Sequence, residues 1–177
     1  MRVPILTSVL FVLILSGGYA HAQDTHAMEP LTLSIAGKVA DSDEHKLPGC
    51  EVLVFKGNNL VGQQLTERNG RFSLELGLGE EFSMEFRMEG YLPKRILVDT
   101  RADLPKDLLE IAPMEIDMHM MPASKYTGAD TDELDFPFAI VAWDKRAQAF
   151  VQDREYTTDM MRTNGALLLM SGRAVKK

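Results

Sequence analysis

Two consecutive runs of alternating side chains, between residues 71 and 91, constrain the fold more than any other feature of the chain. Apolar side chains stand at every second position of both runs: Phe72, Leu74 and Leu76 in the first, and Phe82, Met84, Phe86 and Met88 in the second. Such alternation is typical of half-buried antiparallel strands. The stretch therefore predicts a hairpin with Phe86 buried, and with Glu85, on the opposite face, exposed and cheap to replace.

Five further runs of the same kind flank this hairpin. They lie at residues 31–39, 50–55, 60–66, 91–99 and 114–120, and polar or glycine-containing turns such as Asn69-Gly70 separate the strands. Seven short strands at this spacing predict an all-β sandwich of two sheets.

Four of these segments resemble, in order, the signatures of the carboxypeptidase regulatory-like domain. They are Ile35–Asp41, Leu47–Phe55, Asn69–Phe72 and Gly90–Lys94, and Cys50 stands where that family usually has alanine. The resemblance implies a seven-stranded Greek-key, transthyretin-like sandwich over residues 31–121, in an envelope or extracellular setting. Such domains are mostly accessory modules, and a fold does not define a function, so the resemblance implies little chemistry.

Residues 1–22 have the pattern of a secretory signal peptide. Arg2 precedes an apolar run from residue 3 to 15, and small residues end the segment, so we expect cleavage near Ala22/Gln23. The apolar run is shorter than the roughly 20 residues that cross a bilayer. Because no cysteine lies near the expected cleavage site, a lipoprotein is disfavoured. We therefore expect a periplasmic or secreted protein without a later transmembrane segment, whose residues 23–30 form a flexible tail.

Charge and cysteine content narrow the classes of partner. The formal net charge is -7, and lysine and arginine form no run, so nucleic acid and anionic lipid are poor partners. Because Cys50 is the only cysteine, no intramolecular disulfide can form. An exported chain of this kind depends on its hydrophobic core for stability.

The C-terminal third departs from the sandwich pattern. Residues 122–135 are acidic and lack apolar periodicity, which predicts a linker. Residues 136–177 predict a hairpin followed by a helix that Asp153 caps and that ends near Met170. An apolar strand and helix outside a complete sandwich must be buried somewhere. Four aromatic residues are therefore candidates for binding a partner: Phe136, Phe138, Trp143 and Tyr156.

Several side chains are candidate metal ligands, but the sequence favours a structural role for them. Met118, His119, Met120 and Met121 offer soft ligands for Cu(I), but alternation places Met118 and Met120 with the core residues. Asp41, Asp43 and Glu44 form a polar turn without the spacing of a dedicated calcium loop. The histidines that follow the signal peptide are too far apart in sequence for a zinc peptidase motif. We expect no cofactor and no catalytic residue.

These features together predict a non-enzymatic scaffold or interaction module of the cell envelope, whose partner is another envelope protein. The alternative is a periplasmic binding protein for carbohydrate or peptide, which would expose the aromatic side chains of Tyr91, Tyr126, Trp143 and Tyr156. A copper-binding protein is a third hypothesis.

Overall fold

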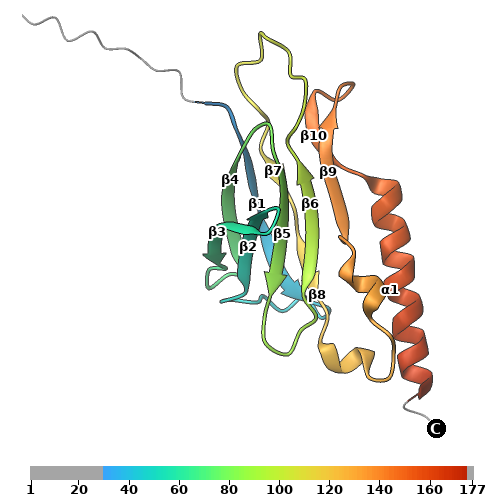
Figure 1. Ribbon diagram of the computed structural model, residues 1–177. Coiled ribbons are helices and arrows are strands. Elements are labelled where there is room, and N and C mark those ends of the chain that lie inside the picture. The colour runs from blue at the N-terminus through green and yellow to red at the C-terminus, as the bar shows by residue number, and fades with distance from the viewer. Residues whose placement is uncertain (1–29, 175–177) are drawn as a thin grey trace, which may run out of the picture.

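Strands dominate residues 30–174, the part of the chain that the computed structural model describes (Figure 1). The signal peptide and most of the tail predicted from the sequence lie outside this part. In order, the elements are β1 (Thr32–Asp41), β2 (Glu51–Lys56), β3 (Asn59–Leu65), β4 (Arg71–Gly77), β5 (Glu81–Arg87), β6 (Lys94–Asp99), β7 (Met114–Glu115), β8 (Met118–Met120), the 3₁₀ turns η1 (Ala123–Tyr126) and η2 (Asp132–Asp135), β9 (Ala139–Asp144), β10 (Ala149–Gln152) and the helix α1 (Arg154–Ala174).

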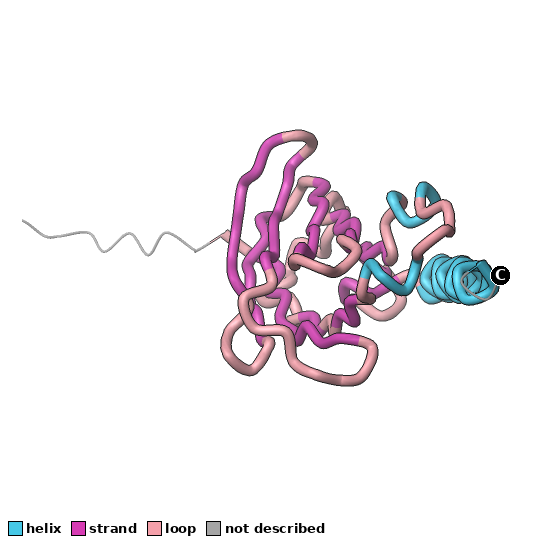
Figure 2. Tube along the Cα trace, turned by 90° about the horizontal axis from the view of Figure 1, so that it is seen from below, coloured by secondary structure: helices cyan, strands magenta, loops and turns pink. Residues whose placement is uncertain are grey.

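Two sheets pack face to face. One has the order β4-β1-β7, with β8 also pairing with β1, and the other has the order β10-β9-β6-β5-β2-β3. Seen from below, the strands form two layers and α1 lies outside them at one edge (Figure 2). The predicted fold class, an all-β sandwich followed by a hairpin and a C-terminal helix, is confirmed.

The core between the sheets follows the alternation in the sequence. Phe86 is fully buried and meets Phe72 edge to face, with 5.4 Å between the ring centroids. Leu33, Ile35 and Val39 of β1 are buried to the same degree. Gly70 adopts a positive φ of 77° in the turn before β4, as the Asn69-Gly70 pair predicts.

The run at 114–120 forms two short strands instead of one. Both β7 and β8 run parallel to β1, and the regular pairing is interrupted between them at Ile116 and Asp117, although the Ile116 N–H still donates to the Ala36 carbonyl at 2.9 Å. The backbone of Ile116 approaches β1 so closely that a Cβ on Gly37 would lie 1.9 Å from the Ile116 carbonyl oxygen. Only glycine fits there, which explains why Gly37 stands at an inward position of an otherwise apolar strand.

The C-terminal hairpin joins the sandwich itself. β9 pairs in parallel with β6, from Ile96↔Ala139 to Val98↔Val141, and β10 adds the edge strand. The predicted cap of α1 is confirmed, because the backbone N–H of Tyr156 donates to Asp153 Oδ1 at 3.0 Å. The helix runs to Ala174, four residues beyond the predicted end.

Residues 122–135, predicted as a linker, fold into η1 and η2 and are tied to α1. The Tyr126 hydroxyl donates to Asn164 Oδ1, and Ser171 Oγ donates to the Lys125 carbonyl at 2.5 Å. The division of the chain at these residues into separate domains stays a prediction.

The expectation that Glu85 is exposed is wrong. Its side chain faces away from the core, as alternation requires, yet the residue is only 5% exposed. Arg87 Nε donates to Glu85 Oε1 at 2.6 Å, and Arg95 Nη2 lies 3.5 Å from Oε2. Glu85, Thr131, Leu134 and Asp135 line one groove on this outer face. The alternation of β5 could not reveal the pairing of Glu85 with Arg95, because Arg95 belongs to the neighbouring strand β6.

Candidate functional site

A narrow crevice opens where β6 begins, between that strand, the 131–138 segment and α1. It has an apolar part and a more polar part that share residues 92–95 and Leu134. The apolar part is lined by Leu92, Pro93, Lys94, Arg95, Met121, Tyr126, Leu134, Phe136, Phe138, Met160 and Asn164. The polar part adds Glu85, Thr131 and Asp135, and has a volume of about 120 Å³. We call these two parts together the β6 crevice.

Backbone and side-chain hydrogen bonds hold the walls of the β6 crevice in place. The Phe138 N–H donates to the Arg95 carbonyl at 2.6 Å, which begins the pairing of β9 with β6. The Tyr156 hydroxyl donates to the Pro137 carbonyl at 2.7 Å and fixes the same segment to α1. Because three separate elements meet here, the β6 crevice exists only when the C-terminal segment is folded onto the sandwich.

Lys94 is the unusual side chain of the β6 crevice. Its Nζ lies 4.1 Å from the centroid of the Phe138 ring, a cation–π arrangement. Burial lowers the pKa of Lys94 from 10.5 to about 8, because it disfavours the charged form. Among the side chains that the structure describes, no carboxylate oxygen lies within 4.0 Å of this ammonium group.

The structure brings together some of the predicted partner-binding residues. Phe136 and Phe138 both line the β6 crevice, and Phe136 is 64% exposed at its rim. Tyr156 is half-buried next to them, with its hydroxyl on Pro137. Trp143 lies elsewhere, packed edge to face on Phe150 with 5.3 Å between the centroids and in contact with the core.

The predicted copper ligands do not converge. Met118 and Met120 are buried in the core, as alternation indicates, whereas His119 points outward and its Nε2 lies 3.0 Å from Glu44 Oε1. Met121 is half-buried and lines the β6 crevice. The parity that makes β8 a core strand thus separates the two buried thioethers from the imidazole.

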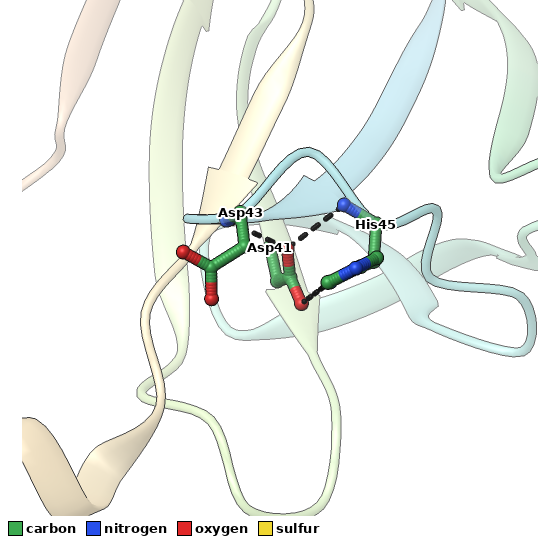
Figure 3. Close-up of side chains that lie close together, drawn as sticks. All are labelled: Asp41, Asp43 and His45. Atoms are coloured by element: carbon green, nitrogen blue, oxygen red, sulfur yellow. Dashed lines mark hydrogen bonds and ion pairs between the residues drawn. The ribbon is translucent and has the colours of Figure 1, made fainter.

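The polar turn after β1 brings Asp41, Asp43 and His45 close together (Figure 3). Asp41 Oδ1 accepts the backbone N–H groups of Asp43 and His45 at 2.8 and 2.9 Å, and Oδ2 lies 3.1 Å from His45 Nδ1. Burial alone would raise the pKa of Asp41, but these hydrogen bonds outweigh it and hold the pKa below its usual value. The Asp41 carboxylate therefore closes its own turn, a structural role that accounts for the cluster.

Cys50 offers no reactive thiol. It is fully buried in the core, and burial raises the pKa of its thiol to about 11. A thiol with such a pKa is almost entirely protonated at neutral pH and is a poor nucleophile. Its place at an alanine-like position is consistent with its role as a small core residue.

Three residues of the β6 crevice that the sequence analysis missed come from two elements far apart in the chain. Lys94 begins β6, whereas Met160 and Asn164 belong to α1, and no local pattern links them. One signal was present: Lys94 has the inward parity of Ile96 and Val98 in β6. A charged residue at a position of buried parity is unusual and marks a place to examine.

Known proteins offer little to compare. No family model matches the chain, and no curated protein matches it. Among solved structures, 3-chlorocatechol 1,2-dioxygenase from Rhodococcus opacus 1CP matches at 12% identity and a TM-score of 0.39, over 55% of this chain and 62% of the enzyme. The Bacillus anthracis TIE protein matches at 11% identity and a TM-score of 0.42, over 52% and 17% of the two chains.

The shaft pilin SpaA from Lactobacillus rhamnosus GG is a third structure of this kind, at 11% identity and a TM-score of 0.40, over 51% of this chain and 48% of the pilin. In all three cases the match spans less than two thirds of the other protein. Similarities of this size carry no argument about activity. Within residues 30–174, no helix combines the length and the apolar character needed to cross a bilayer.

Proposed function

We propose that this chain is a non-catalytic, exported interaction module of the cell envelope, and that a protein partner docks at the β6 crevice. The observation that carries the proposal is the position of Phe136. Its ring is 64% exposed at the rim of an apolar crevice, although the neighbouring Phe138 and Leu134 are partly covered. A large exposed aromatic beside an apolar depression is the usual anatomy of an interface anchor.

The size of the β6 crevice favours a docking surface over a small-molecule site. Its polar part has a volume of about 120 Å³, whereas pockets for small ligands have volumes of roughly 300–1,000 Å³. The four aromatic residues that would form a carbohydrate platform are not well exposed: Tyr126 is buried, and Tyr91, Trp143 and Tyr156 are half-buried. The hypothesis of a carbohydrate-binding protein therefore has less support.

The carboxypeptidase regulatory-like resemblance and the expected signal peptide support the envelope setting. Fractionation of the native cells with N-terminal sequencing tests this part. We expect the chain in the periplasm or the medium, beginning near Gln23. A chain found in the cytoplasm with residues 1–22 intact would contradict it.

Site-specific photo-crosslinking in intact cells tests the docking site. A photoreactive phenylalanine analogue at position 136 should give one defined adduct with another polypeptide. The matched control is position 109, because Leu109 is also exposed and lies in the loop between β6 and β7, where no crevice is proposed. No adduct at position 136, or the same adducts at both positions, would refute docking at the β6 crevice.

A further inference from the structure

We infer that the β3 edge of the six-stranded sheet pairs antiparallel with the β3 edge of a second copy of this chain, about a two-fold axis at Gln63. This contact lies on the edge opposite β10 and is independent of docking at the β6 crevice. Three observations carry the inference: the open backbone groups of β3, an uncharged edge that is complementary to itself, and flanking groups that select one register.

The backbone of β3 has hydrogen-bonding groups that point away from the sheet. Within residues 30–174, β3 pairs with β2 alone. Thr66, just after β3, donates its N–H to the Cys50 carbonyl at 2.9 Å. Alternation therefore turns the N–H and carbonyl groups of Gln63 and Leu65 toward the open side. Such a row of groups is a template for another strand.

The side chains along this edge complement a second copy of themselves. Residues 57–66 carry no charge, and Leu60, Val61 and Leu65 are 51%, 53% and 55% exposed. When Gln63 lies opposite Gln63, Val61 of each copy lies opposite Leu65 of the other. The two Gln63 residues then exchange a pair of backbone hydrogen bonds at the axis. Apolar side chains that are exposed in one copy would thus be covered by those of the other.

The charges that flank β3 are compatible with this register. Glu67 and Arg68 are exposed just after the strand, and they would lie opposite Asn59 and Asn58 of the second copy. An asparagine amide can donate to a carboxylate and accept from a guanidinium group. An axis one residue earlier in the chain would instead place Arg68 opposite Lys56, and like charges directly opposite each other are destabilising.

Gln64 disfavours the register with the axis one residue later. In that register Gln64 would face its own copy, and Val61 would lie opposite Glu67. The Gln64 side chain is already directed toward the other sheet, where its Oε1 accepts the Ser73 N–H at 3.2 Å. The axis at Gln63 leaves this link between the two sheets undisturbed.

The size of the contact indicates a weak dimer. A single added pair of short strands buries less than the roughly 1,200–2,000 Å² of a stable complex, so we expect a dissociation constant on the order of 100 µM. At concentrations well below this value the β3 edge is open to solvent, and at higher concentrations mass action favours the pair.

Sedimentation equilibrium of the chain that begins at Gln23 tests the pairing, over concentrations from about 10 µM to about 1 mM. We expect a monomer at the low end and a dimer at the high end, because a two-fold contact closes on itself. A monomer at all concentrations, or oligomers larger than a dimer, would overturn the inference.

Two charged variants locate the axis. Gln63→Glu and Gln63→Lys each place like charges opposite one another and should weaken the dimer about fivefold or more, whereas an equimolar mixture should form a mixed dimer at least about tenfold tighter than either variant alone. Unchanged dimers of both variants, or a mixture no tighter than the separate variants, would overturn the inference.

A matched substitution at the opposite edge serves as the control. Gln148 is exposed in the turn between β9 and β10, so Gln148→Glu should leave dimer formation unchanged. Melting temperatures measured at about 10 µM, where the chain is monomeric, should be the same for the parent and both Gln63 variants. This measurement separates loss of pairing from loss of the fold.

Photo-crosslinking from position 63, in cells that overproduce the chain, identifies the occupant of the edge. We expect an adduct of twice the mass of the chain. An adduct with a different polypeptide, or the absence of the doubled chain, would overturn the inference. The adduct from position 136 should persist in the Gln63→Glu variant, so the β3 contact and docking at the β6 crevice succeed or fail separately.

Discussion

The two edges of the six-stranded sheet are finished in opposite ways. At one edge, the last strand, β10, is only four residues long, and α1 follows it directly. The Asp153 N–H, just before α1, donates to the Ile140 carbonyl of β9 at 2.8 Å. At the other edge, β3 has seven residues and exposes Leu60, Val61 and Leu65 by about half of their surface. No charged residue stands between Lys56 and Glu67.

This contrast shows what the C-terminal third does for the fold. Sheet edges are usually shortened, charged or covered, because an open edge pairs with other chains. Residues 139–174 cover the edge at β6, and the β6 crevice is a consequence of the way they do so. The β3 edge has a bulge at Val61, and the Ser73 N–H of the other sheet donates to Gln64 Oε1 of β3 at 3.2 Å.

The largest difference between the edges should appear in alanine substitutions. Phe150 of β10 is buried and packs on Trp143, so Phe150→Ala should lower the free energy of unfolding by about 3–5 kcal/mol. Leu65→Ala on β3 should change it by less than about 0.5 kcal/mol, since that side chain is largely in solvent. Urea unfolding measures both. Equal losses would mean that β3 is covered in solution.

Glu85 tests whether the ion pairs on the outer face of this sheet, with Arg87 and Arg95, stabilise the fold. Glu85→Gln should lower the free energy of unfolding by about 1.5–3 kcal/mol, the usual worth of hydrogen bonds to charged groups. Glu81→Gln is the control, because Glu81 pairs with Arg101 on the exposed surface, and such pairs contribute about 0–1 kcal/mol. If Glu85→Gln lowers the free energy of unfolding no more than Glu81→Gln does, the Glu85 ion pairs contribute no more than an exposed pair.

The start of α1 contributes a smaller amount to the covered edge. Asp153→Ala removes the cap of the helix and should cost about 1 kcal/mol. Asp159→Ala, in an exposed pair with Arg162, should cost a few tenths of that amount. Thermal unfolding of the two variants measures the difference. Indistinguishable melting temperatures would mean that tertiary contacts, and not the cap, fix the helix start.

Hydrogen exchange should reveal the smallest effect, which is local. The Thr66 N–H donates to the Cys50 carbonyl at 2.9 Å, so alternation directs the amides of Leu65 and Gln63 away from β2. These two amides should exchange far faster than those of β9, which has strands on both sides. Protection of Leu65 and Gln63 that grows with protein concentration would show that a second chain pairs with the β3 edge.

Local pattern was sufficient for most of the fold. Alternation in β4 and β5 placed Phe72 and Phe86 inside, and Asp153 marked the start of α1, because both signals depend on neighbouring residues. The same rule correctly put Met118 and Met120 into the core. The prediction that Phe136, Phe138, Trp143 and Tyr156 bind a partner came from the apolar segment beyond a complete sandwich, and it stays a prediction.

Only tertiary structure decided the rest. Alternation assigns Glu85 to the outer face, but it contains no information about Arg95, which pairs with Glu85 from the neighbouring strand β6. It also gives no account of Lys94, whose environment is made by Phe138, Leu134 and Met160 from two later segments. The sequence by itself thus determined the strands, their faces and the helix cap. Which edge of the sheet is covered, and therefore where the β6 crevice lies, depends on contacts between residues far apart in the chain.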